Sequence, residues 1–191
     1  MRSYSMNEGR AHMRLKSLYQ PIFEAVNDGY AEYRDSPLVP IHTARTVASA
    51  INDSVFAALV NKVSELKPVF DKKINMRFLR VEGRPPILLW VKKTDPGRKS
   101  RNFLTPHAMQ MDSGNYELFP SAMTITLGIR VSQDRMSISR VTLTPPCVAK
   151  KEPEWWIDII APANVGRLRV VGAPVSSVQV IRSSQQRQLG T

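Results

Sequence analysis

Cysteine is scarce in this sequence, and its scarcity excludes two common kinds of framework. The 191 residues include one cysteine, Cys147, so neither an intramolecular disulfide nor a cysteine-based zinc cluster can form. We expect Cys147, between Pro146 and Val148, to be a small buried residue rather than a catalytic thiol. Such sparing use of cysteine is typical of a reducing compartment and predicts a cytoplasmic or otherwise intracellular protein.

Long apolar segments are absent as well. The apolar runs are far shorter than the ~20 residues needed to span a bilayer. The first residues, MRSYSMNEGRAHMRLK, lack the apolar centre of a secretory signal, and Glu8 argues against a transit peptide. We therefore expect a soluble protein with no membrane partner.

The motifs that usually carry catalysis or cofactor binding are missing. The glycines are isolated, and neither a GxxxxGK[ST] loop, a GxGxxG loop nor a GxSxG elbow occurs. His12, His42 and His107 fall in different predicted elements, with no spacing that suggests a metal site. The sequence thus predicts no metal and no cofactor, and favours a non-enzymatic protein.

Positive charge is what the sequence has in excess. The formal net charge is +11, and residues 68–101 contain ten Lys or Arg against three acids. Residues 161–191 add four Arg and no acid, whereas residues 24–36 are net negative. A charge concentrated in this way attracts polyanions, which makes its position along the chain more informative than its total.

The first third of the chain has the periodicity of helices. In RLKSLYQPIFEAVND the apolar residues recur at three- and four-residue steps, and Pro21 must either kink this helix or open a second one. Thr43 is a good N-cap for a further helix, whose apolar stripe is predicted to run to Leu66, just before Pro68.

From residue 76 the period changes to that of strands. A slip in the alternation near Ser139 and Arg140 predicts a β-bulge. Trp155 and Trp156 are adjacent, so they should face opposite sides of the sheet, with one in the core. The other would lie under a covering helix or be exposed for stacking. The expected strands are MRFLRVE, ILLWVKK, SAMTITLGIRVS, MSISRVTL, EWWIDII, RLRVV and VSSVQVI.

Helices followed by strands predict an α+β fold. We expect N-terminal helices packed on one face of a mostly antiparallel, roughly seven-stranded sheet. One domain would span residues 1–183, with a helical part at 1–67 and a sheet part at 68–183, and a disordered tail at 184–191. The segment 94–120 is too long for a turn and could hold a short helix at TPHAMQM or a functional loop.

The loop KKTDPGRKSR, residues 92–101, is the strongest candidate for phosphate binding. Lys and Arg also protect sheet edges from pairing with other chains, but ten cations in this segment exceed that need. Our first hypothesis is therefore a non-enzymatic protein that contacts DNA or RNA phosphates largely independently of sequence. The proposed contacts are Lys72, Lys73, Lys92, Lys93, Arg98, Lys99 and Arg101.

Two other functions fit the same composition. The basic surface could dock onto an acidic protein, which would make this chain an inhibitor, adaptor or assembly subunit. Alternatively, His107 as a general base with Arg98, Lys99 and Arg101 could form a small metal-independent ribonuclease or toxin.

Overall fold

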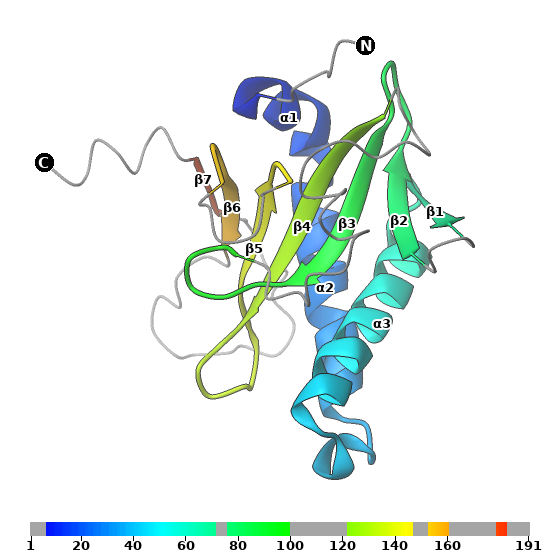
Figure 1. Ribbon diagram of the computed structural model, residues 1–191, viewed down its shortest axis with the longest axis vertical. Coiled ribbons are helices and arrows are strands. Elements are labelled where there is room, and N and C mark those ends of the chain that lie inside the picture. Colours follow the sequence, from blue (N-terminus) through cyan, green and yellow to red (C-terminus); the bar gives the residue numbers. More distant parts are fainter. Residues whose placement is uncertain (1–6, 72–75, 100–121, 147–152, 161–178, 183–191) are drawn as a thin grey trace, which may run out of the picture.

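The computed structural model describes residues 7–71, 76–99, 122–146, 153–160 and 179–182, and over these residues the fold is α+β (Figure 1). The predicted class is thus confirmed. Two short 3₁₀ turns, η1 (Lys16–Leu18) and η2 (Val39–Ile41), precede the second and third α-helices. The α-helices are α1 (Glu8–Leu15), α2 (Tyr19–Arg34) and α3 (Ala44–Lys62).

Among the described residues, seven strands form one mixed sheet in sequential order, β1 to β7. β3 and β4 are parallel, and every other neighbouring pair is antiparallel. The strands are β1 (Leu66–Asp71), β2 (Met76–Val81), β3 (Ile87–Lys93), β4 (Met123–Val131), β5 (Ile138–Thr144), β6 (Ile157–Ile160) and β7 (Gln179–Arg182).

Local sequence signals mark where the helices α2 and α3 begin. The Thr43 hydroxyl accepts a hydrogen bond from the Thr46 amide at 3.3 Å, which confirms the predicted N-cap of α3. Pro21 opens a second helix rather than kinking one: it lies in the first turn of α2, where a missing amide proton costs no helical hydrogen bond.

The predicted end of α3 was wrong. The helix ends at Lys62, and Leu66 is the first residue of β1, a strand that the periodicity did not indicate. The backbone leaves the helix and turns at Ser64 and Glu65. Leu66 nevertheless lies in the same core as Leu59, and this is why it fits the apolar stripe of the helix. The predicted strand RLRVV lies outside the described residues. Those residues form seven strands, about the number predicted, but β1 is among them and RLRVV is not.

Alternation along the strands gives the sheet two distinct faces. On one, which we call the core face, residues such as Leu89 and Leu127 share a hydrophobic cluster with buried residues of α2 and α3. On the other, the opposite face, Phe78, Leu88 and Trp90 form a smaller cluster. Side chains at alternate positions on the opposite face therefore do not contribute to the helix-sheet core.

A bulge interrupts the pairing of β4 with β5. Arg130 pairs with Arg140 and Val131 with Ile138, which leaves Ser139 as the extra residue. The Ser139 hydroxyl donates a hydrogen bond to the Arg130 carbonyl at 3.2 Å. The predicted bulge is confirmed. No helix in the described part of the chain is long and apolar enough to cross a membrane.

Candidate nucleic-acid interface

The loop after β3 closes into a tight turn. The Arg98 amide donates to the Asp95 carbonyl at 3.1 Å, and the Asp95 amide donates to the Lys99 carbonyl at 3.0 Å. The Asp95 carboxylate accepts a further bond from the Lys99 amide at 2.9 Å. Arg98 has a φ of 64°, the left-handed conformation typical of the residue that ends a type I turn in such a loop. The Asp-Pro-Gly signal therefore produces a closed loop.

This loop lies over β4 and β5. The Thr94 amide and hydroxyl both donate to the Ile129 carbonyl, at 2.9 and 3.3 Å. A side chain at Gly128 would bring its Cβ to 2.7 Å from the Thr94 methyl group, so only glycine allows this approach. Arg140 of β5 donates to the Pro96 carbonyl at 2.9 Å. The start and the middle of the loop are thus both fixed to the sheet.

A buried carboxylate on β6 holds the far end of the loop. Asp158 has no exposed surface, and its Oδ1 accepts hydrogen bonds from Arg98 Nε at 3.1 Å and from the Thr142 hydroxyl at 2.8 Å. Arg98 Nη2 forms an ion pair with the other carboxylate oxygen, and Arg140 Nη1 lies 3.6 Å from that oxygen. The carboxylate is therefore desolvated but compensated by two guanidinium groups.

The two tryptophans before β6 point to different surroundings. Trp155 is buried in the core cluster, whereas the Arg98 guanidinium carbon lies 4.5 Å from the Trp156 ring centroid. The prediction that adjacent tryptophans diverge, with one in the core, is confirmed. Arg98 is thus placed between a carboxylate and an aromatic ring, an arrangement that suits the flat guanidinium group.

Lys92 belongs to the same face. Strand register places it in one row with Gly128, Thr142 and Asp158, because each is paired with the next across neighbouring strands. Its amino nitrogen lies 3.5 Å from the ring centroid of Trp90. This row brings residues from β3, β4, β5 and β6 onto a single face of the sheet, where Gly128, Thr142 and Asp158 are buried.

Of the seven predicted contacts, four lie in the described part of the chain. Lys92 and Arg98 come together on the opposite face, and Lys99 lies in the loop above it. Lys93 is exposed at the end of β3, and alternation turns it toward the core-face side. Lys72, Lys73 and Arg101, like His107 and Cys147, lie outside the described residues.

Arg130 and Arg140 are site residues that sequence reasoning missed. They are paired across β4 and β5 on the opposite face, and Arg140 is close to both Arg98 and Asp158. Burial lowers the pKa of Arg140 below the usual arginine value, the charge of Asp158 raises it, and the charges of Arg98 and Arg130 lower it further. Arginine stays protonated in proteins, so Arg98 and Arg140 place two positive charges at the Asp158 carboxylate, and Arg130 adds a third beside Arg140. An acid within an apolar strand was the available signal, because it demands nearby cations.

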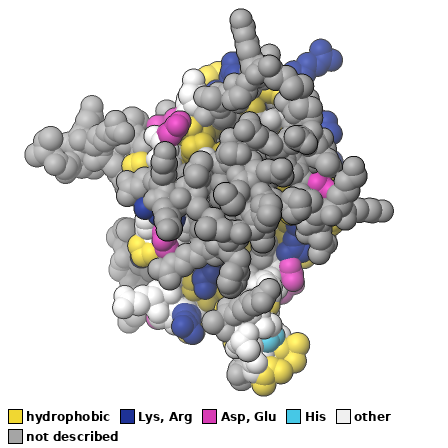
Figure 2. Space-filling view, in the orientation of Figure 1, with side chains coloured by type: hydrophobic (Ala, Val, Ile, Leu, Met, Phe, Trp, Pro, Cys, Tyr) yellow, Lys and Arg dark blue, Asp and Glu magenta, His cyan; other side chains and the backbone are white. Residues whose placement is uncertain are grey.

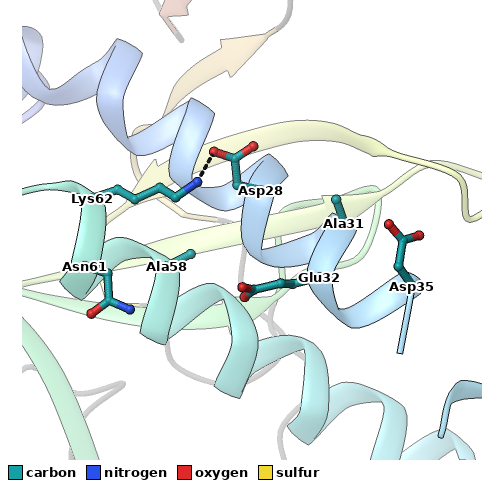
Figure 3. Close-up of a pocket in the computed structure, with 7 residues that line it drawn as sticks. All are labelled: Asp28, Ala31, Glu32, Asp35, Ala58, Asn61 and Lys62. Carbon is teal, nitrogen blue, oxygen red and sulfur yellow. Dashed lines mark hydrogen bonds and ion pairs between the residues drawn. The ribbon is translucent and has the colours of Figure 1, made fainter. Parts of the chain in front are cut away.

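Acidic residues gather elsewhere, on the helical layer. A groove of about 410 Å³ between α2 and α3 is lined in part by Asp28, Glu32 and Asp35. Figure 3 shows these three carboxylates along α2, with Lys62 reaching Asp28 from α3. The hydrogen bond from Lys62 to Asp28, at 2.6 Å, raises the pKa of Lys62. In Figure 2, Lys and Arg side chains occupy several separate places around the face shown, with Asp and Glu between them. Among the described residues, no group of three His, Cys, Asp or Glu could hold a metal ion.

No family model, curated protein or solved structure matches this chain.

Proposed function

We propose that this protein is a non-enzymatic, basic protein that associates with nucleic acid through phosphate contacts largely independent of sequence. The observation that carries the proposal is the excess of guanidinium groups on the opposite face. Arg98 and Arg140 contact the single carboxylate of Asp158. Arg130 lies beside Arg140 across the β4–β5 pair, and Lys92 lies on the same face of the sheet. Guanidinium and ammonium groups are the usual phosphate ligands of such proteins.

Within this proposal the basic loop has two kinds of residue. Arg98 is held by Asp158 and Trp156, so we assign it to shaping the loop as well as supplying charge. Lys92, Lys93 and Lys99 are the described lysines proposed to approach phosphates, together with Lys72, Lys73 and Arg101. Replacing Arg98 would disturb a buried ion pair and confuse folding with binding.

The proposal is best tested at the lysines. Fluorescence anisotropy with single-stranded and double-stranded DNA and RNA, measured over a range of salt concentrations, gives both affinity and salt dependence. In Lys92→Gln/Lys99→Gln, affinity should fall by a similar factor for every sequence, and the slope of log K against log salt should decrease by about two.

The matched control is Arg10→Gln/Lys16→Gln, which removes the same charge from exposed positions on α1 and η1. This control should leave the salt slope nearly unchanged. Equal effects of the two double variants would mean that net charge alone governs binding, and no measurable binding by the unaltered protein would refute the proposal.

A second candidate is the protein-binding module whose basic surface docks onto an acidic partner. Exposed apolar side chains at the α2–α3 connection favour a protein contact, since Leu38 is 54% and Ile41 76% exposed. A stoichiometric protein partner recovered after nuclease treatment would support this function. The ribonuclease hypothesis depends on His107 and remains a prediction, which loss of growth arrest in His107→Ala would support.

A further inference from the structure

The cluster around Asp158 has more positive charge than its own residues neutralise. Arg98 and Arg140 are both 14% exposed at their side chains, so their charges are only partly solvated. One carboxylate serves both of them. Arg130 has no ion pair with any of the described residues, although it lies on the neighbouring strand. The cluster therefore has an excess of about two positive charges.

The excess positive charge is concentrated at Arg130 and Arg140. The two residues are direct cross-strand partners, and like charges at such positions are unfavourable. Arg140 also has a buried Nε with no hydrogen-bond partner, while its other nitrogens reach Asp158 and the Pro96 carbonyl. A buried N–H donor without an acceptor costs stability, and an anion placed here would satisfy it.

Asp158 already orients the cluster. It aligns the planar Arg98 group and lies 3.6 Å from Arg140, so neither guanidinium is left to swing freely in solvent. Pre-oriented forks of this kind bind tetrahedral oxyanions through paired hydrogen bonds. Arg130 then supplies donors from the adjacent strand.

We propose that Arg130 and Arg140, supported by the charge of Arg98, bind a doubly charged phosphate group, as found at the phosphorylated end of a nucleic-acid strand. The inference rests on the proposed function for the source of that group. Two excess positive charges match a phosphomonoester, which carries −1.5 to −2 near neutral pH, better than an internal phosphodiester with one negative charge.

The test compares one oligonucleotide with a 5′-phosphate and the same oligonucleotide with a 5′-hydroxyl, by anisotropy at fixed salt. The phosphorylated strand should bind about tenfold more tightly, a difference of about 1.4 kcal/mol, because its terminal phosphate adds charge-assisted hydrogen bonds to the arginines. Added inorganic phosphate should occupy the same site and reduce the affinity of the phosphorylated strand toward that of the 5′-hydroxyl strand. In a separate titration without oligonucleotide, ³¹P NMR should show inorganic phosphate binding to the protein.

Arg130→Gln is the informative variant, because Arg130 is outside the buried ion pair and its loss should leave the fold intact. The variant should lose the tenfold preference and most of the inorganic phosphate binding, while Arg10→Gln should keep both. Arg130→Lys keeps the charge but not the fork, and should recover only part of the preference.

The outcomes separate the two proposals. Equal binding of both oligonucleotides with no phosphate binding would overturn the oxyanion site and leave the nucleic-acid function standing. Phosphate binding that depends on Arg130, with neither oligonucleotide bound, would support the site and refute the nucleic-acid function. A preference that survives in Arg130→Gln would also overturn the assignment.

Discussion

Asp158 on β6 contacts three side chains of the opposite face. It is fully buried, and it joins the loop after β3, through Arg98, to β5, through Thr142. A buried carboxylate is tolerated only when cations and hydrogen bonds compensate its lost hydration. Loop position and sheet stability are therefore coupled at one side chain.

Replacing this carboxylate should destabilise the protein. Asp158→Ala would leave Arg98 and Arg140 largely buried without a counter-charge, which typically costs about 3–5 kcal/mol of unfolding free energy. Urea denaturation measures the loss. Asp53→Ala, which removes the more exposed partner of Arg77, is the control and should change the midpoint little. Similar losses in both variants would contradict the role given to Asp158.

Tyr30 is expected to make the folding stability depend on pH above neutrality. Its hydroxyl donates to the Arg135 carbonyl at 2.7 Å, and burial, followed by the nearby Tyr33, raises the pKa of Tyr30 above 10.0. The folded state thus holds this proton more tightly than the unfolded state. The resulting stability should be complete below pH 10 and should decline as the pH rises through the folded-state pKa.

Tyr30→Phe tests this contribution. At neutral pH the variant should lose about 1 kcal/mol with the hydrogen bond. Above pH 10 its stability should decline less than that of the unaltered protein. Urea midpoints across that pH range give the comparison, and parallel curves would show that Tyr30 does not titrate as expected.

Among the elements, α2 and α3 are in close backbone contact at Gly29. A Cβ there would lie 2.7 Å from the Val55 Cα and 2.8 Å from the Ser54 carbonyl oxygen, and both atoms belong to backbone. Since backbone cannot move aside cheaply, the helices must separate if the position is enlarged. The glycine therefore sets the distance between the two helices.

Gly29→Ala should be destabilising despite the better helix propensity of alanine. We expect a net loss of about 1–3 kcal/mol, because the clash exceeds the gain in propensity of about 1 kcal/mol. Gly9→Ala in α1 is the matched control, as its added methyl would meet only Asn7 Oδ1, at 3.8 Å. Thermal unfolding should show a lower midpoint for Gly29→Ala alone.

Local features of these elements were predictable from sequence. The cap at Thr43, the helix start near Pro21 and the bulge at Ser139 each depend on residues a few positions apart. β1 was missed because Leu66 fits the apolar stripe of α3 and is buried in the same core. The parallel pairing of β3 with β4 depends on partners distant in sequence, which periodicity does not reveal.

The candidate site was only partly predictable for the same reason. Charge density identified the loop, but no spacing connects Arg98 with Asp158, which is brought to it by the pairing of β5 with β6. Arg130 and Arg140 lie outside the basic segment 68–101 in the sequence, and only the pairing of the strands places them on the same face as its residues. Composition thus located the charge, whereas the sheet determined which charges meet.

For the molecule as a whole, the uneven distribution of charge has a measurable consequence. The acidic groove lies on the helical layer, while Lys92 and the arginine cluster lie on the opposite face. Charges separated by more than about 10 Å are largely screened at 0.1 M salt. A polyanion bound at the sheet should therefore respond weakly to charges in the groove.

Heparin chromatography tests this expectation with two single variants. Lys92→Gln lowers the net charge at the proposed surface, and Glu32→Gln raises it in the groove. Lys92→Gln should elute at clearly lower salt, whereas Glu32→Gln should elute close to the unaltered protein. Shifts of equal size and opposite sign would show that binding follows total charge, against a localised surface.

The parallel junction between β3 and β4 also bears on how the chain reaches this fold. Only a few residues separate the strands in three antiparallel pairs, so these pairs can form early. They are β1–β2, β2–β3 and β4–β5. The β3–β4 pairing requires the chain from Lys93 to Met123 to close, which costs more conformational entropy. Non-local pairing of this kind slows folding. Arg98 lies near the start of the connection from β3 to β4, whereas Asp158 follows its end. We therefore expect the Arg98–Asp158 ion pair to form late in folding, together with or after the β3–β4 pairing.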